Sequence, residues 1–211
     1  MPVVKLARSI LLVLAALSPL GMSYLAQAQA GGAPGSKAAS TYFIELLAER
    51  RVDDLPPDPL YWQLEDFKTA EEARAAAGPL SLTATTSKRH WLFTLGPRGK
   101  RSPRGSLIAE IGPVARPSAT TYLIRINLAG GPPGSRTPVH SHPGSEAIYV
   151  LKGRVSQRTP HGTQYANAGG VLNAHAPEMA MQLSSSGATE LEQVVMFLVD
   201  ADRPFSPVAR F

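Results

Sequence analysis

Residues 134–153, with the sequence GSRTPVHSHPGSEAIYVLKG, constrain the fold of this chain more than any other segment. They place His140, His142 and Glu146 between a glycine-rich turn and a run of residues typical of a β-strand. Because successive side chains of a strand point to opposite faces, His140 and His142 are expected to project from the same face. Two neutral imidazoles and a carboxylate form a partial coordination sphere for a divalent first-row metal. The segment therefore predicts a metal site beside a β-strand.

The spacing around these three side chains is itself specific. From Gly134 to Gly153 the residues follow the pattern Gly-x5-His-x-His-x3-Glu-x6-Gly, which resembles the first motif of the cupin superfamily at every position. The resemblance implies a mainly β fold, a small β-barrel or jelly roll, with His140, His142 and Glu146 coordinating the metal inside it. The implied ion is divalent Fe, Mn, Ni or Zn.

The second motif of that family is only partly present, in residues 168–181. The family typically has a Gly-Asp turn, a strand, a proline-containing turn and a third histidine ligand. Here the usual histidine position falls near Ala180, and the nearest histidine is His175, a few residues earlier. Two alternatives stay open. His175 reaches the metal as a third histidine ligand, or it caps a turn or lines the pocket and the protein supplies only two histidines and Glu146.

The strand after the ligands predicts what lies beneath the metal. Ile148 and Val150 share the alternation of Glu146, so they are expected to face the barrel interior. Together with Met179 and Met181 of the second motif, they form the predicted substrate pocket, which is largely apolar.

From Thr120 onward, short strand-like runs alternate with turn signals, as is typical of an all-β sandwich or barrel. Residues 192–199 are apolar on both faces, and a strand of that kind is buried on both sides. Its outer face must be covered, either by the N-terminal part of the chain or by a second subunit. Cupins commonly pair through such surfaces, so the resemblance implies a homodimer.

Residues 38–117 are predicted to form an N-terminal α+β extension that packs on a barrel of residues 118–211. Residues 41–50 carry apolar side chains at helical spacing, which favours an amphipathic helix. A second helix is predicted at residues 70–77, because Thr69 and Glu72 form a capping box. Trp62 and Trp91 are interpreted as packing anchors. The predicted strands of this part are residues 61–64, 80–86, 91–95 and 106–111.

Residues 1–30 have the anatomy of a cleavable signal peptide. Lys5 and Arg8 precede an apolar run at residues 10–20, and small residues end the segment at Ala28-Gln29-Ala30. An uncleaved membrane anchor is the alternative, but the apolar run is short for a span. The Gly/Ala/Pro/Ser composition of residues 31–37 predicts a flexible leader. These features predict a secreted or periplasmic protein with no transmembrane segment after cleavage.

The amino-acid composition and net charge exclude several kinds of functional site and partner. The chain has no cysteine, which excludes disulfides, thiolate ligands and a cysteine nucleophile. Loss of Lys5 and Arg8 with the signal peptide lowers the formal charge from +5 to +3, and with export this argues against nucleic acid as a partner. The first hypothesis is a metalloenzyme acting on a small molecule, with dioxygenase-like oxidoreductase chemistry favoured. The alternatives are a non-catalytic module that binds a small ligand or metal, and a structural envelope protein with a vestigial site.

Overall fold

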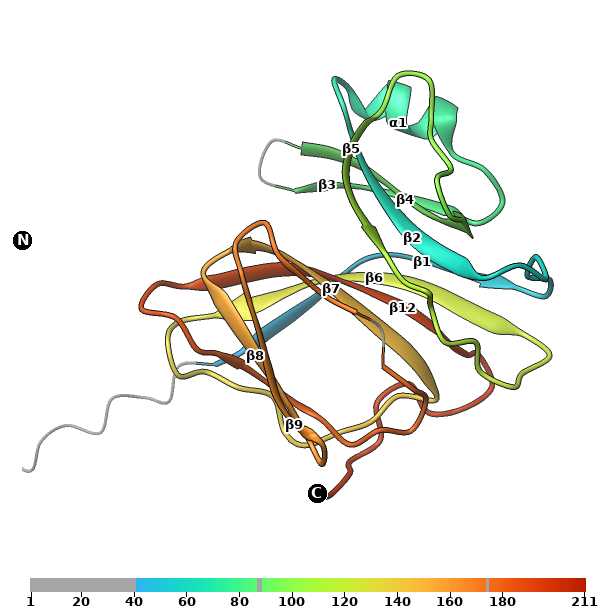
Figure 1. Cartoon of the computed structure of the whole chain (residues 1–211). Coiled ribbons are helices and arrows are strands. Elements are labelled where there is room, and N and C mark those ends of the chain that lie inside the picture. The colour runs from blue at the N-terminus through green and yellow to red at the C-terminus, as the bar shows by residue number, and fades with distance from the viewer. Residues whose placement is uncertain (1–40, 87–88, 174) are drawn as a thin grey trace, which may run out of the picture. The chain divides into compact units, whose positions relative to one another are not determined.

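The computed structural model of this chain describes residues 41–86, 89–173 and 175–211. These residues form twelve strands and one short helix, so the predicted mainly β class is confirmed (Figure 1). Within these ranges no helix is long and apolar enough to cross a membrane. The predicted signal peptide and flexible leader lie outside the described residues.

The barrel consists of two antiparallel sheets that enclose one apolar interior. The larger sheet has the order β1-β6-β12-β7-β10 and the smaller one β11-β8-β9. An interior cluster that includes Ile148, Val155 and Leu183 joins the two sheets, so they pack face to face. The strands of the larger sheet are β1 (Phe43–Val52), β6 (Tyr122–Gly131), β7 (Gly144–Lys152), β10 (Val171–Leu172) and β12 (Leu191–Asp200). Those of the smaller sheet are β8 (Arg154–Thr159), β9 (Gly162–Asn167) and β11 (Gln182–Ser185).

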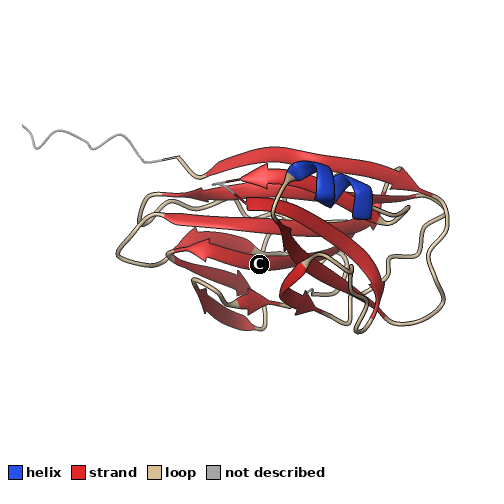
Figure 2. Ribbon diagram, turned by 90° about the horizontal axis from the view of Figure 1, so that it is seen from above, coloured by secondary structure: helices blue, strands red, loops and turns tan. Residues whose placement is uncertain are grey.

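A separate sheet of order β3-β4-β2-β5, with the helix beside it, forms the extension (Figure 1). Figure 2 shows this helix lying against strands. The helix begins where the sequence predicts, because the Thr69 side chain accepts a hydrogen bond of 3.2 Å from the backbone N–H of Glu72. Ala73 of this helix packs on Phe67 and Leu92 of the sheet. The elements are β2 (Leu60–Phe67), α1 (Ala70–Ala76), β3 (Ser81–Thr86), β4 (Arg89–Pro97) and β5 (Ser106–Ile111), so all four predicted strands are confirmed.

The helix predicted at residues 41–50 is wrong, because this segment contributes the strand β1. It pairs with β6 from Phe43 opposite Gly130 to Val52 opposite Tyr122. A bulge between Leu46 and Ala48 shifts the side-chain alternation, which explains why its apolar residues do not follow a strand period. The strand β1, assigned to the extension from sequence, therefore lies in the larger sheet of the barrel.

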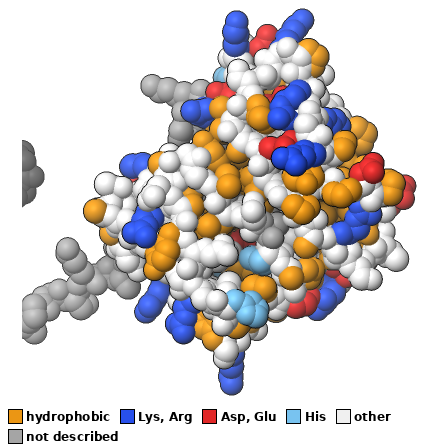
Figure 3. Space-filling model, viewed as in Figure 1, with side chains coloured by type: hydrophobic (Ala, Val, Ile, Leu, Met, Phe, Trp, Pro, Cys, Tyr) orange, Lys and Arg blue, Asp and Glu red, His pale blue; other side chains and the backbone are white. Residues whose placement is uncertain are grey.

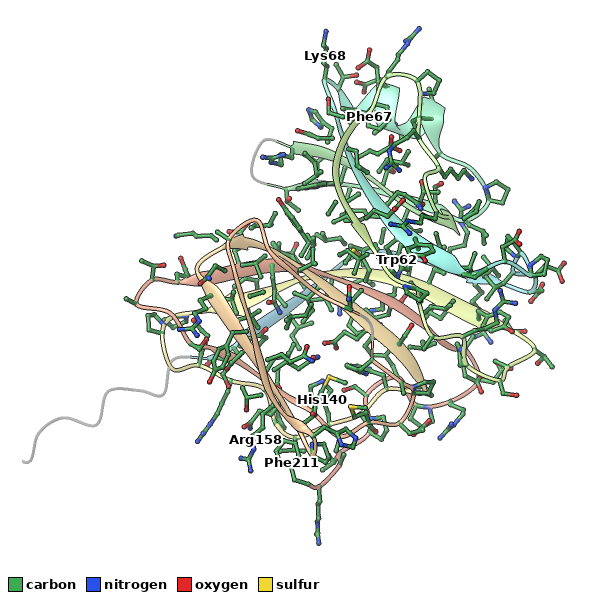
Figure 4. All side chains as sticks on the ribbon, viewed as in Figure 1. Trp62, Phe67, Lys68, His140, Arg158 and Phe211 are labelled. Carbon is green, nitrogen blue, oxygen red and sulfur yellow. The ribbon has the colours of Figure 1, made fainter. Side chains whose placement is uncertain are left out.

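Strand β12 is buried on both faces, as its sequence predicts. The side chains of Val195 and Phe197 point into the barrel interior, whereas those of Val194 and Met196 pack in a second cluster with the extension. Trp62 belongs to this second cluster and lies between the extension and the barrel (Figure 4). The extension thus covers the outer face of β12, which is the first of the two predicted alternatives. A homodimer, which stays a prediction, would need another surface.

Candidate metal centre

The two glycines that frame the ligand motif have backbone conformations that favour glycine. Gly134 has φ 85° in the turn after β6, and Gly153 has φ 78° between β7 and β8. A Cβ atom on Gly153 would also collide with the backbone oxygen of Glu190. The glycines therefore have a physical role, because they let the chain turn sharply before and after the segment that carries the ligands.

His140, His142 and Glu146, referred to below as the trio, come together at one end of the barrel. Glu146 lies in β7 and His142 just before it, while His140 forms an isolated bridge with Met181. One nitrogen or carboxylate oxygen of each lies within 4.8 Å of the others, so the three residues could hold a metal ion. His140 also forms an isolated bridge with Val208 of the C-terminal segment, and it is labelled in the barrel in Figure 4.

Backbone carbonyls fix the orientation of both imidazoles. Nδ1 of His142 lies 2.6 Å from the carbonyl oxygen of Phe205, and Nδ1 of His140 lies 2.9 Å from that of Pro138. A carbonyl oxygen can only accept, so each Nδ1 carries the hydrogen. Both Nε2 atoms are left as potential ligands, which is the usual arrangement of metal-binding histidines.

The contact between His142 and Glu146 calls for a cation. Nε2 of His142 lies 3.2 Å from Oε2 of Glu146, yet this buried nitrogen has no partner in hydrogen-bond geometry. With Nδ1 already protonated, a neutral imidazole would place its Nε2 lone pair against a carboxylate oxygen. Either a second proton or a metal ion must lie between them. The other carboxylate oxygen accepts a hydrogen bond of 3.3 Å from Gln157 Nε2, which holds Glu146 in place.

The electrostatics of the trio favour the states that bind a metal. Burial acts to raise the pKa of the Glu146 carboxyl, but His142 beside it and the charges of His175 and His140 outweigh burial and lower that pKa. Burial is the main cause that lowers the pKa of His140. Glu146 is therefore ionised and His140 neutral near pH 7, as coordination requires.

His175 lies near the trio but outside it. Its Nε2 lies 3.2 Å from Sδ of Met181, and its Nδ1 lies 3.1 Å from the carbonyl oxygen of Ala176. It lines a second, more open cavity of about 670 Å³ beside β8 and β9. Histidine side chains are visible at the surface in Figure 3. His175 is thus close enough to influence the charge state of Glu146, but its ring contacts a methionine sulfur.

A cavity of about 210 Å³ adjoins the trio inside the barrel. Its polar lining includes Tyr42, Arg125 and Asn127, and its apolar lining includes Phe197 and Phe205. Burial raises the pKa of the Tyr42 phenol far above its ordinary value, and the charge of Glu146 adds to this effect. Tyr42 therefore remains a protonated hydrogen-bond donor.

The residues predicted to form the substrate pocket lie elsewhere. Ile148 and Val150 face the interior as expected, but they pack in the apolar cluster that fills the barrel and do not line the cavity. Met181 is fully buried, and Gln157 Nε2 lies 3.6 Å from its sulfur. Met179 lines the second cavity. The cavity beside the trio is lined instead by residues that include Arg125 and Asn127 of β6 and Phe205 of the C-terminal segment.

The sequence contained a signal for two of the missed cavity residues. Arg125 and Asn127 are the polar positions of β6, and they alternate with Ile124 and Ile126, which pack on the extension. Polar residues on the opposite face of such a strand indicate a cavity there. Phe205 carried no such signal, because its contact with His142 spans 63 residues.

Comparison with known proteins gives partial structural likeness only. No family model matches the sequence, and no curated protein matches it. Solved structures that overlap the chain include a cupin superfamily protein from Desulfitobacterium hafniense, with 14% identity, a TM-score of 0.33 and coverage of 36% of this chain and 68% of that one. A DMSP lyase from Ruegeria pomeroyi has 17% identity and a TM-score of 0.35, with coverage of 41% of this chain and 43% of the lyase.

An oxalate oxidase in complex with the substrate analogue glycolate has 21% identity and a TM-score of 0.35, with coverage of 41% of this chain and 46% of the oxidase. This chain thus spans less than half of the length of the lyase and of the oxidase. These TM-scores lie below 0.5, so the fold stated here rests on the strands of this chain and their pairing. That pairing agrees with the cupin-type β-barrel which the ligand motif implies.

Proposed function

We propose that this chain is an exported metal-dependent enzyme that acts on a small organic molecule, with dioxygenase-type oxidoreductase chemistry. One observation carries the metal part of the proposal. Nε2 of His142 is buried, has no partner in hydrogen-bond geometry and lies 3.2 Å from Oε2 of Glu146, and a metal ion bound by both atoms would satisfy that nitrogen.

The trio suits a divalent first-row metal. Two imidazoles and one carboxylate leave coordination positions open for a substrate or for dioxygen. When bound, such an ion polarises oxygen groups of a substrate and supports reactions with dioxygen. The chain itself orients the ligands through the carbonyls of Phe205 and Pro138, and Gln157 holds the carboxylate. Phe197 and Phe205 line the adjoining cavity and exclude water from the side of His142.

The proposal is tested with protein loaded with Fe(II), Mn(II) or Ni(II) and incubated with catechols, flavonols and β-dicarbonyls. Oxygen uptake and product mass are followed together. We expect oxygen consumption that disappears in His140→Ala, because that variant removes one ligand. Metal-loaded protein that converts none of these compounds would refute the dioxygenase assignment.

A second candidate is a module that binds a small ligand without converting it. Among the described residues that line the cavity, no carboxylate or imidazole lies outside the trio, so no separate general base is at hand. Tyr42 does not fill this role, since its raised pKa keeps it protonated. Tight binding of a compound with no product under any of the metals would favour this candidate.

Export is proposed from residues 1–30 alone. Cleavage after Ala30 would produce a mature chain that begins at or near Gly31. N-terminal sequencing of the protein recovered outside the cytoplasmic membrane tests this, and an intact Met1 would refute it.

A further inference from the structure

We infer that the ligand of the cavity is a small organic carboxylate, held between the trio at one end and Arg125 at the other. This inference rests on the proposed function and adds the substrate class. Arg125 is the only cationic side chain that lines the cavity within the described part of the chain, apart from the histidines of the trio.

Strand register places Arg125 and Glu146 in one row across the larger sheet. Arg125 of β6 lies opposite Phe197 of β12, and Phe197 lies opposite Glu146 of β7. Neighbouring strands lie about 4.8 Å apart, so the backbones of Arg125 and Glu146 lie about 10 Å apart, with one aromatic side chain between the two charged side chains. All three side chains line the same cavity. A ligand that touches both ends lies over Phe197.

The guanidinium of Arg125 keeps donor capacity toward the cavity. Its Nε donates to Asn127 Oδ1 at 3.0 Å, and its Nη1 lies 3.4 Å from Oε2 of Glu49. Neither contact uses Nη2. The centroid of the Phe205 ring lies 4.4 Å from the guanidinium carbon, so the ring supports the guanidinium through a cation–π contact. A planar guanidinium with free N–H groups matches the geometry of a carboxylate.

The neighbouring polar groups are also donors. The Tyr42 hydroxyl accepts a hydrogen bond of 2.9 Å from Gln193 Nε2, so its own hydrogen is left to donate. The Thr137 hydroxyl accepts one of 3.0 Å from the backbone N–H of Leu183, and its hydrogen is likewise left. Glu146 is the only carboxylate among the described lining residues, and it would coordinate the metal. A cavity that offers donors and one fixed cation is complementary to an anion.

The apolar lining indicates an organic anion. Val195, Phe197 and Phe205 cover the space between the two polar ends, where a purely inorganic anion would leave apolar surface without a partner. The ligand therefore has a carboxylate for Arg125, a compact carbon body for the aromatic wall, and a metal-binding oxygen at its other end. A volume of about 210 Å³ limits it to a small molecule.

A different explanation is that Arg125 serves only its ion pair with Glu49. The Glu49 side chain is 43% exposed, and a pair with such a partner contributes little to stability. The two explanations predict different results for Glu49→Gln. If the ion pair is the sole role of Arg125, Glu49→Gln and Arg125→Gln should have the same effect on ligand binding. If Arg125 holds a ligand, only Arg125→Gln should impair ligand binding.

The experiment uses two pairs of chelators in which a carboxylate replaces a hydrogen or a methyl group, protocatechuate against catechol and acetopyruvate against acetylacetone. Their dissociation constants are measured by calorimetry on metal-loaded wild type, Arg125→Gln, Arg125→Lys and Glu49→Gln. We expect the wild type to bind each carboxylate roughly 10- to 100-fold more tightly than its partner, as for a charge-assisted hydrogen bond. This preference should vanish in Arg125→Gln, persist in part in Arg125→Lys, and persist in Glu49→Gln.

The metal content and melting temperature of each variant are measured first. Equal binding of both members of a pair by the wild type, or a preference that survives in Arg125→Gln, would overturn the inference. So would metal-loaded protein that binds none of the four compounds. Wild type that takes up no metal would instead refute the proposed function before any ligand is added, which separates the two failures.

Discussion

Nδ1 of His142 lies 2.6 Å from the carbonyl oxygen of Phe205, so the last residues of the chain orient a candidate metal ligand. The Phe205 ring also packs on the imidazole, with ring centroids 4.9 Å apart. Further on, Ser141 N–H donates to the Pro207 carbonyl and Ala209 N–H donates to the Val139 carbonyl. The C-terminal segment thus runs along the ligand motif and is hydrogen-bonded to it.

Deletion of residues 205–211 should weaken metal binding about 10- to 100-fold while the barrel stays folded. The imidazole of His142 loses its acceptor, so its orientation is no longer fixed. Metal affinity is measured by competition with a chelating dye, and folding by circular dichroism. Deletion of Phe211 alone is the control, because that ring stacks on Arg158 and leaves Phe205 in place. Unchanged affinity after the longer deletion would show that the segment has no part in the site.

Replacement of a ligand should remove metal binding. We expect wild type to bind one divalent ion per chain and to gain about 2.7 kcal/mol in free energy of unfolding at a hundredfold excess over the dissociation constant. His142→Ala and Glu146→Gln should lose this gain, which is measured as the metal-dependent shift of the melting temperature. His161→Ala, in the exposed turn between β8 and β9, should keep it. Equal shifts in all four proteins would place the ion elsewhere.

His175 should contribute to the site without being essential for it. Its imidazole contacts the sulfur of Met181, while its charge acts on Glu146 and His140. For His175→Ala we therefore expect one ion per chain and an affinity lowered less than about tenfold. Titration calorimetry gives both numbers. Loss of stoichiometric binding would mean that the loop carries His175 into the coordination sphere, as the second motif of the family implies.

The stability of the metal-free protein should depend on pH through His140. Burial lowers its pKa below 6.5, so the folded state binds this proton less readily than the unfolded chain. Stability is therefore full above pH 6.5 and is lost as pH falls through the lowered pKa. Between about pH 7 and about pH 5, the melting temperature of wild type should fall more steeply than that of His140→Gln. Parallel curves would contradict this.

The sequence predicted the trio and most of the strands because both depend on local patterns. The glycines, histidines and glutamate of residues 134–153 are close in sequence, and alternation alone placed Ile148 and Val150 inside. The prediction of a helix at residues 41–50 was wrong because the spacing of apolar residues carries no information about the edge of β6, with which this segment pairs as a strand. The predicted pocket residues differ from those that line the cavity beside the trio for a related reason. The walls of this cavity come from β1, β6 and the C-terminal segment, and no local pattern states that these distant segments meet.

Removal of a side chain from the outer face of β12 should destabilise the whole protein. Met196 is fully buried between the barrel and the extension, so Met196→Ala should cost about 2–5 kcal/mol in free energy of unfolding. Urea denaturation measures this. Leu107→Ala is the control, because Leu107 is 39% exposed on β5 and its loss should cost less than about 0.5 kcal/mol. A similar small cost for both would mean that the extension packs loosely on the barrel.

The double burial of β12 also limits how this protein can be shortened. A chain that began at residue 118 would keep every residue of the ligand motif, but it would expose Val194, Met196 and Leu198 to water and leave β6 without β1. An uncovered apolar face beside an open sheet edge is a template for aggregation. A fragment that carries the metal site and stays folded in water must therefore also include the segments that cover β12 and β6, namely the extension and β1.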